Sequence, residues 1–402
     1  MRRLYTLFIT ASLSLAGALA QDMGSGIVGD TYYRVRNLGS NRYIYVKENH
    51  DESDLVSMHA DFSAIELWKD ASKYFYDPAT VLYVCKTSDG RYDIQAQGTG
   101  VAELTGYTVN IGKMSDGTYK VYATKAGTTV YLSDETTSSK DEGKLGTKNT
   151  NEKYRRWIVD KIETNSATNY FGIKPNIELN GKYYLSFYAG FTFKTASPGM
   201  HVYYVSKVAG NVATLTEIGG EIPAGTPVIV ECASADPSSN RLEVLTSQPA
   251  SLNSNKLTGI YYCKENPKKN STEAYKAFDA STMRVLTLSN GKLVFNNDKA
   301  KLLKSNLLEE IEATDWDSPD LDDIEVVCIP ANTCYLKADA GTPAELDIHF
   351  VGLGLDEILS ENKNDDAVGV YSLSGTQLRA TNDVQGLPAG LYIVGGVKVV
   401  IK

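Results

Sequence analysis

The residues that most often carry catalysis are few in this chain and far apart. There are four histidines among 402 residues, and none lies in an H-E-x-x-H zinc motif. The chain has no G-x-S-x-G nucleophile elbow and no P-loop. His201 leads an apolar run and His349 lies within the run LDIHF, so we predict ordinary strand positions for both. The sequence therefore predicts no catalytic residue, no cofactor and no metal site.

The cysteines do not form a metal motif either, because their spacing matches no C-x-x-C pattern. The five are Cys85, Cys232, Cys263, Cys328 and Cys334. Because the number is odd, at least one is free or pairs outside the chain. An oxidising compartment would allow a Cys232–Cys263 disulfide within one domain. The alternative is that these cysteines are buried and unpaired, acting as small apolar residues.

An acidic run is the strongest local concentration of charge. Asp315–Asp323 holds five carboxylates in nine residues. A calcium loop alternates oxygen ligands around a glycine turn, and Pro319 stands where that glycine would be needed. We expect a solvated acidic loop, and whether it binds calcium is left open.

Aromatic residues are the remaining candidates for a ligand surface. Tyrosine occurs 26 times, and Trp68 and Trp157 each lie at the end of an apolar group of residues. Half-buried tyrosines are common on strands, but exposed rings also bind ligands. We expect Trp68 and Trp157 to fill a core, with stacking on a ligand as the alternative.

The first 20 residues have the pattern of a cleaved secretory signal. Basic Met1-Arg2-Arg3 precedes the apolar run Leu4–Ala16, and Ala18-Leu19-Ala20 fits a cleavage site. No later run approaches 18 apolar residues, so we expect no transmembrane span in the mature chain. The net charge of −9 falls to −11 once the two arginines are removed, which gives no support to nucleic-acid binding. We expect a location outside the cell or on its outer surface.

Residues 30–163 are predicted to form short strands separated by Gly-containing turns. The strands fall into three groups of about 40 residues, which open at Tyr32, Val81 and Tyr119. Three such repeats are typical of a β-trefoil. An irregular β-barrel is the alternative.

Two segments of this region carry a resemblance. YYRVRNLGSNRYIYV, together with RRWIVDKI near the domain end, resembles the ricin-B-like β-trefoil modules of secreted bacterial proteins. That family binds sugars through one shallow pocket per repeat and is marked by Gln-x-Trp. The matching positions are Glu66-Leu67-Trp68 and Arg155-Arg156-Trp157, neither of which keeps the Gln, and the second group has no Trp. The resemblance implies a β-trefoil and a glycan ligand.

A second domain is predicted over residues 170–351, after a small polar boundary at 164–169. About ten strands with Gly and Pro turns favour a β-sandwich. Asn290-Gly291 between apolar strands predicts a hairpin with a type I′ turn. One helix is expected over Lys301–Glu312, with Ser305 as its cap. Its predicted apolar face consists of Leu303, Leu307, Leu308 and Ile311.

One local pattern occurs three times. The copies are Ile222-Pro223-Ala224-Gly225, Ile329-Pro330-Ala331-Asn332 and Leu387-Pro388-Ala389-Gly390. We predict a type I turn with Pro in the second position and Gly or Asn in the fourth. An apolar run follows each copy, so each turn is expected to lead into a strand.

The end of the chain, residues 368–402, follows a charged linker at 352–367 and resembles the C-terminal sorting domain of type IX secretion substrates. The residues that carry the resemblance are Tyr371, Gly375, Leu387, Pro388, Ala389, Gly390, Tyr392 and Lys402. The resemblance implies passage across an outer membrane, with attachment or release there, and the export machinery as a partner. The alternative is an ordinary small β appendage.

These observations predict an all-β exported protein with a β-trefoil-like domain, a β-sandwich and a small β tail. We expect a non-catalytic protein that binds glycan or protein ligands through its β-domain surfaces. One alternative is a polysaccharide hydrolase with the trefoil as a targeting module, since glycosidase carboxylates come from distant strands. The other is a structural component of a surface assembly.

Overall fold

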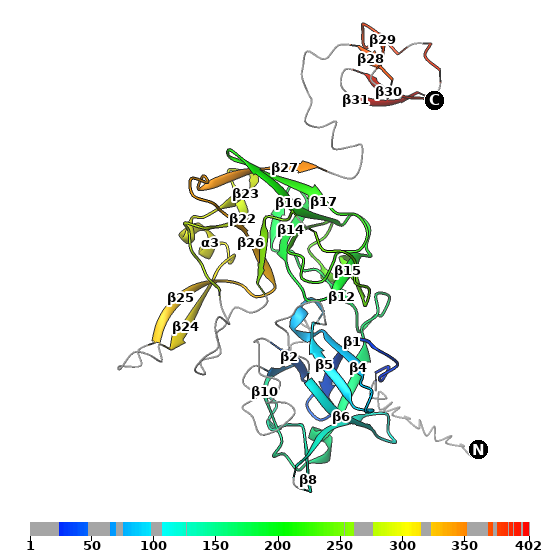
Figure 1. Ribbon diagram of the computed structural model, residues 1–402, viewed down its shortest axis with the longest axis vertical. Coiled ribbons are helices and arrows are strands. Elements are labelled where there is room, and N and C mark those ends of the chain that lie inside the picture. The colour runs from blue at the N-terminus through cyan, green and yellow to red at the C-terminus, as the bar shows by residue number, and fades with distance from the viewer. Residues whose placement is uncertain are drawn as a thin grey trace, which may run out of the picture.

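The regular structure in the described part of the chain is mostly β-strand, as the sequence predicts (Figure 1). The computed structural model describes residues 24–46, 65–69, 75–97, 107–125, 127–252, 254–260, 276–314, 323–351, 369–372, 376–384, 386–388, 390–394 and 397–401. Within these ranges there are three short 3-10 helices, η1 (Pro78–Thr80), η2 (Glu152–Arg155) and η3 (Pro237–Ser239), and one α-helix, α3 (Lys299–Lys304).

The N-terminal strands form one sheet that closes on itself. They are β1 (Thr31–Asn37), β2 (Tyr43–Val46), β3 (Ile65–Trp68), β4 (Leu82–Lys86), β5 (Tyr92–Ala96), β6 (Tyr107–Lys113), β7 (Tyr119–Lys125), β8 (Thr128–Tyr131), β9 (Ser133–Asp134), β10 (Glu142–Gly146) and β11 (Trp157–Lys161). Antiparallel pairing runs β1-β4-β5-β6-β7-β11 and returns to β1, where Val35 lies opposite Val159. Six strands therefore make a ring, from which β2, β3, β8, β9 and β10 extend. We call this unit the barrel.

The alternation of side chains along β1 explains why both of its faces are buried. Tyr33 and Val35 point into the barrel core, whereas Tyr32 and Arg34, one position away, leave it on the opposite face. Trp157 of β11 belongs to the barrel core, has no exposed surface, and donates its indole N–H to the Leu132 carbonyl at 3.1 Å.

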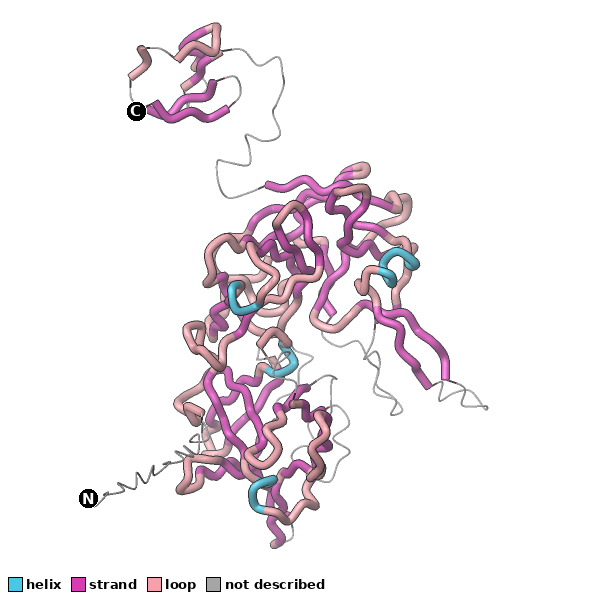
Figure 2. The backbone as a smooth tube through the Cα atoms, turned by 180° about the vertical axis from the view of Figure 1, so that it is seen from behind, coloured by secondary structure: helices cyan, strands magenta, loops and turns pink. Residues whose placement is uncertain are grey.

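The middle of the chain forms a ten-stranded sheet and two three-stranded sheets, which we call the middle domain. The strands are β12 (Phe171–Gly172), β13 (Ile177–Leu179), β14 (Lys182–Phe187), β15 (Thr192–Thr195), β16 (His201–Ala209), β17 (Val212–Glu217), β18 (Val228–Cys232), β19 (Arg241–Leu245), β20 (Leu257–Ile260), β21 (Lys276–Ala277), β22 (Met283–Ser289), β23 (Lys292–Asn296), β24 (Glu309–Thr314), β25 (Asp323–Ile329), β26 (Thr333–Lys337) and β27 (Glu345–Val351). The large sheet curls around its own apolar core, and the β24–β25 hairpin extends away from it (Figure 2). Asn290 and Gly291 join β22 to β23 with φ of 50° and 74°, which confirms the predicted type I′ turn.

The proline turns lead into strands as predicted, but their predicted turn type is wrong. Gly225 has φ of 71°, and the Thr226 N–H donates to the Pro223 carbonyl at 3.2 Å. Proline is therefore the first residue of the turn and Gly225 the third, which is the position where a type II turn needs positive φ. Asn332 takes the same place in the second copy, with φ of 56°. Ala389 of the third copy lies outside the described residues.

The predicted helix over Lys301–Glu312 is also wrong in its extent. Helix α3 begins after Asp298, whose side chain accepts a hydrogen bond from the Lys301 N–H, and Ser305 is its C-terminal cap. Asn306 has φ of 54°, a left-handed conformation that ends the helix. The residues that follow form β24, which pairs along its whole length with β25, so strand pairing overrides the apolar spacing.

The barrel and the middle domain share a hydrophobic core. Tyr32 and Val81 of the barrel pack in one cluster with Phe171, Phe191 and other apolar residues of the middle domain. Arg34 is only 1% exposed in this junction. Its guanidinium donates to Asn169 Oδ1 and to the Tyr170 carbonyl, both at 2.7 Å, and to Thr80 Oγ1 at 3.0 Å.

A second polar contact crosses the junction at Gln97. Gln97, which is 1% exposed, donates to Asn332 Oδ1 at 2.8 Å and accepts from the Gly190 N–H at 3.0 Å. Because both ends of this amide are held by the middle domain, the two units are fixed against each other.

The tail forms a small four-stranded sheet in the order β29-β28-β30-β31. Its strands are β28 (Val370–Tyr371), β29 (Gln377–Arg379), β30 (Gly390–Val394) and β31 (Val397–Ile401). Tyr371 lies opposite Ile393, and the Tyr392 hydroxyl donates to the Pro388 carbonyl at 2.9 Å. Leu387 precedes this strand, whereas Gly375, Ala389 and Lys402 lie outside the described residues.

Replacing Arg34 should destabilise the protein strongly. We expect Arg34→Ala to lower the free energy of unfolding by about 2–4 kcal/mol, because three buried acceptors lose their donor. The control is Arg36→Ala, two positions along β1, where the guanidinium donates to Asn41 Oδ1 at 2.9 Å in an exposed contact. It should change stability by less than about 1 kcal/mol. Urea denaturation measures both, and equal effects would contradict the role given to Arg34.

Candidate functional site

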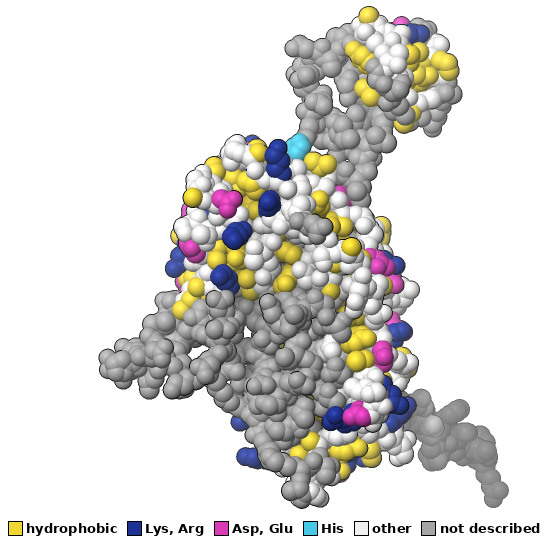
Figure 3. Space-filling view, viewed as in Figure 1, with side chains coloured by type: hydrophobic (Ala, Val, Ile, Leu, Met, Phe, Trp, Pro, Cys, Tyr) yellow, Lys and Arg dark blue, Asp and Glu magenta, His cyan; other side chains and the backbone are white. Residues whose placement is uncertain are grey.

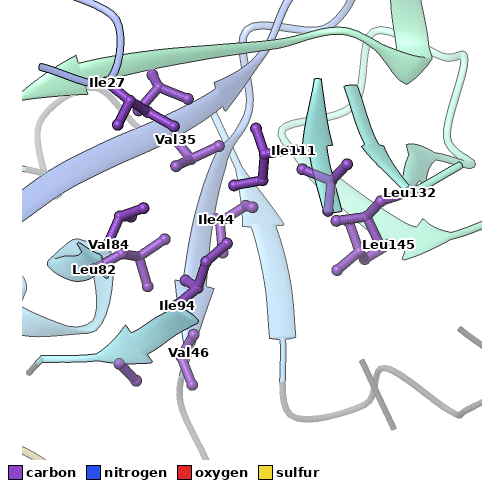
Figure 4. A pocket seen from close by; sticks show the side chains of 13 residues that line it. Ile27, Val35, Ile44, Val46, Leu82, Val84, Ile94, Ile111, Leu132 and Leu145 are labelled. Atoms are coloured by element: carbon purple, nitrogen blue, oxygen red, sulfur yellow. The ribbon is translucent and has the colours of Figure 1, made fainter. Parts of the chain in front are cut away.

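A cavity of about 50 Å³ lies inside the barrel (Figure 4). It is lined only by aliphatic side chains, namely Ile27, Val35, Ile44, Val46, Leu82, Val84, Ile94, Ala96, Ile111, Val121, Leu132, Leu145 and Val159. An apolar cavity of this kind offers no group that can bind a metal, hold a proton or attack a substrate. We therefore assign it to the packing of the barrel and look for the site on the surface.

The buried arginines Arg42 and Arg284 hold loops in place through hydrogen bonds to backbone carbonyls. Arg42 and Asp134 form an ion pair at 2.6 Å with both side chains fully buried, and Arg42 also donates to the Thr136 and Ser138 carbonyls. Arg284 donates to four backbone carbonyls around β22, including that of Pro343 at 2.8 Å. Because their donors are directed to backbone carbonyls and a paired carboxylate, these charges hold structure together.

The described histidines lie on strands, as predicted. His201 of β16 contacts Glu217 of β17, with 2.8 Å between Nδ1 and Oε1. His349 lies in β27 opposite Thr214. His50 and His59 lie outside the described residues. Within the ranges that the structure describes, no three His, Cys, Asp or Glu side chains gather in a group able to hold a metal ion.

The four cysteines in the described part of the chain, Cys85, Cys232, Cys328 and Cys334, are all free thiols. Cys232 is a free, fully buried thiol, so the Cys232–Cys263 disulfide is not formed, and Cys263 itself lies outside the described residues. Cys334 is also free and buried. Burial raises the pKa of both thiols to about 12. The acidic run cannot be placed in the same way, because of its residues only Asp323 is described.

The main surface candidate is a group of aromatic side chains, which we call the aromatic cluster. It consists of Tyr43, Tyr45, Trp68 and Phe75 around Ala79. Tyr43 and Trp68 lie directly opposite each other on β2 and β3. Tyr45 is buried beneath, whereas Tyr43, Trp68 and Phe75 are half-buried and keep part of their surface in solvent. Trp68 thus differs from Trp157, which is enclosed in the barrel core.

A stack of rings ties the aromatic cluster to the junction. Phe75 lies on Tyr170 with ring centroids 4.5 Å apart and an angle of 9° between the planes. The Arg241 guanidinium lies 4.0 Å from the centroid of Tyr170 and donates to the carbonyls of Thr164 and Ser166. Two groups this close to one ring must occupy its opposite faces, so Tyr170 is held between Phe75 and Arg241.

Among these residues the sequence singles out only Trp68, for which ligand stacking is the alternative to a place in the core. Phe75, Tyr170 and Arg241 are not predicted as ligand contacts. The concentration of aromatic residues in the run Tyr74-Phe75-Tyr76 was an available signal. Nothing in the sequence places this run beside Tyr170, because that contact exists only once the two domains pack together.

Comparisons with known proteins found little similarity. No family model and no curated protein matches this chain. The structure is similar to that of a mosquitocidal holotoxin, with 10% identity and a TM-score of 0.25, over 78% of this chain and 35% of that one. It is also similar to Cry35Ab1, with 11% identity and a TM-score of 0.24, over 42% of this chain and 47% of that one. This chain spans less than half of either structure, and similarity at this level supports no argument about function.

No helix in the described part of the chain is both long enough and apolar enough to cross a membrane.

Filling the barrel cavity should stabilise the protein. Ala96→Val adds two methyl groups at the cavity wall of β5, so we expect unfolding to require about 1 kcal/mol more free energy. Leu145→Ala enlarges the same cavity and should lower stability by about 2–5 kcal/mol. Thermal denaturation of both variants provides the measurement. A lower melting temperature for Ala96→Val would show that the barrel has no room there.

The buried thiols should resist alkylation while the protein is folded. A raised pKa keeps Cys232 and Cys334 protonated at about pH 8, and burial excludes the reagent. We expect iodoacetamide to leave both unmodified in the native protein and to modify both in guanidinium chloride, as mapped by mass spectrometry. Rapid modification of Cys334 in the native protein would contradict its place in the core.

Proposed function

We propose that this is an exported, non-catalytic protein that binds glycan ligands on the aromatic cluster. The observation that carries the proposal is the half-buried pair Tyr43 and Trp68, held side by side on β2 and β3 and continued by Phe75. Large, rigid rings that keep part of their surface in solvent offer contact area at a small cost in conformational entropy.

A sugar fits this surface better than a flat apolar partner does. The C–H faces of a pyranose pack against aromatic rings, while its hydroxyls need polar groups at the edge. Lys69, which follows Trp68 directly in the chain, is half-buried and places a cationic side chain next to the ring. Tyr76 and Lys174 add a further aromatic and cationic pair, with the ammonium 4.9 Å from the ring centroid.

For the fold, we propose that the barrel is a β-trefoil with a short second unit. The six-stranded ring would be its barrel, and the units would run β1–β4, β5–β6 and β7–β11. The first and third units carry extra strands between their ring strands, namely β2 and β3 in one and β8, β9 and β10 in the other. The middle domain would then be a strongly curled variant of the predicted β-sandwich.

Secretion and surface attachment rest on the two ends of the chain. The N-terminal pattern supports export, and the tail residues Tyr371, Leu387, Pro388, Gly390 and Tyr392 support handling by a type IX secretion machinery.

A hydrolase would require two carboxylates facing each other across a cleft. The candidate surface presents aromatic rings and not a pair of carboxylates, so we propose binding without catalysis.

Removing Trp68 should weaken glycan binding without unfolding the protein. We expect Trp68→Ala to weaken binding of glycans selected on an array by about tenfold or more, since a central aromatic contact contributes about 2 kcal/mol or more. The control is Tyr204→Ala, which removes a half-buried ring from β16 in the middle domain.

Isothermal titration calorimetry measures both variants, and circular dichroism checks that each is folded. Unchanged binding by Trp68→Ala would rule out the aromatic cluster. An array without hits, together with no binding to cells or matrix, would rule out the function.

A further inference from the structure

A second surface group lies on the outer face of β6, β7 and β8. Along β7, Tyr119 and Val121 point into the barrel core, so Lys120 and Tyr122 point outward. Tyr131 of β8 lies opposite Tyr122, with ring centroids 5.9 Å apart. We call Lys120, Tyr122, Tyr131 and Arg155 the cationic patch.

A glycine leaves space beside this group. Gly112 of β6 lies opposite Lys120, and a Cβ atom built on it would approach the Tyr122 ring at 3.5 Å. The Tyr122 ring therefore lies within van der Waals reach of the position that a side chain at 112 would take. Lys120, Tyr122 and Tyr131 are each half-buried and keep part of their surface in solvent.

Two cations converge on one ring in this patch. The Lys120 ammonium lies 4.8 Å from the centroid of Tyr131, and the Arg155 guanidinium lies 5.5 Å from it. Glu152 pairs with Lys120 at 2.6 Å and with Arg156 at 3.5 Å, so one carboxylate serves two cations. Lys120 is held in place with only 15% of its side chain exposed.

Several polar groups of the patch have capacity left for a ligand. Arg155 uses its Nε to donate to the Asn149 carbonyl, and its two terminal amino groups make no hydrogen bond to the described residues. The hydroxyls of Tyr122 and Tyr131 likewise have no hydrogen-bond partner among those residues. A guanidinium with two free amino groups matches the two oxygens of a carboxylate or sulfate.

The sequence around the cationic patch also carries a net positive charge. Residues 107–161 contain ten Lys and Arg and seven Asp and Glu, a net charge of +3 in a chain whose total is −9. Figure 3 shows Lys and Arg side chains on the described surface of the barrel. A positively charged region attracts anionic ligands even when the protein as a whole is acidic.

We propose that the cationic patch is a binding site for acidic sugars, those that carry sulfate or carboxylate groups. Arg155 and Lys120 bind the anionic group, and Tyr122 and Tyr131 contact the sugar ring and its hydroxyls. This inference rests on the proposed glycan-binding function but uses a separate surface. In Figure 1, β8 lies at the end of the barrel away from β12, whereas Phe75 of the aromatic cluster stacks on Tyr170, next to β12.

The test is calorimetric titration of the full mature chain with three oligosaccharides of equal length. One is heparin-derived and sulfated, one is an oligogalacturonate that carries carboxylates alone, and one is neutral. We expect one or both acidic sugars to bind, with affinity falling in about 0.3 M salt. Preference between the two identifies sulfate or carboxylate as the recognised group.

Variants separate this site from general charge attraction and from the aromatic cluster. Arg155→Gln should weaken acidic-sugar binding by about tenfold or more, and Arg155→Lys should recover part of it because the charge returns. Arg91→Gln is the matched control, since Arg91 is an exposed barrel arginine paired with Asp89. Trp68→Ala should leave acidic-sugar binding unchanged.

Three results would overturn the proposal: no binding of either acidic sugar, equal losses in Arg155→Gln and Arg91→Gln, or binding lost in Trp68→Ala alone. If Arg155→Gln binds glycans as well as the unsubstituted protein does, the cationic patch is ruled out as a glycan site, and the proposal for the aromatic cluster is unaffected. If the protein without substitutions binds no glycan at all, both the cationic patch and the aromatic cluster are ruled out as glycan sites.

Discussion

The structure depends on a strand whose two faces are both buried. On one side of β1, Tyr33 and Val35 complete the barrel core. On the other, Tyr32 and Arg34 enter the core that the barrel shares with the middle domain. An arginine can be buried there only because Thr80, Asn169 and the Tyr170 carbonyl take its hydrogen bonds. Two units that share such a junction behave as one scaffold, not as domains on a flexible linker.

The junction also determines how rigid the aromatic cluster is. Asn169 and Tyr170 are neighbours in sequence, so the segment that accepts from Arg34 also supplies the ring beneath Phe75. Arg241 covers the other face of that ring and holds the carbonyls of the boundary segment. Phe75 is thus supported from behind before any ligand arrives. Because these rings are already fixed in position, the surface loses little conformational entropy when a ligand binds. A small entropy loss matters for a glycan-binding site, where few contacts contribute to the affinity.

The sequence predicted local structure well where short-range chemistry decides it. Asn290-Gly291 specifies its hairpin because both residues tolerate positive φ, and the apolar alternation along β1 and β7 predicts strands. It failed where long-range pairing decides. Residues 309–314 have helical spacing of apolar side chains but pair with β25, and Pro223 begins a turn that Gly225 converts to type II. Arg34 was not predicted to be buried, because its partners at Asn169 and Tyr170 are more than a hundred residues away.

The central claim is that ligand binding occurs on the aromatic surface next to the domain junction. Hydrogen–deuterium exchange of the mature protein, with and without a glycan that binds it, tests this claim most directly. The account predicts that protection on binding is concentrated in residues 43–46, 65–69 and 75–80. Protection confined to the middle domain or the tail, with those three segments unchanged, would contradict it.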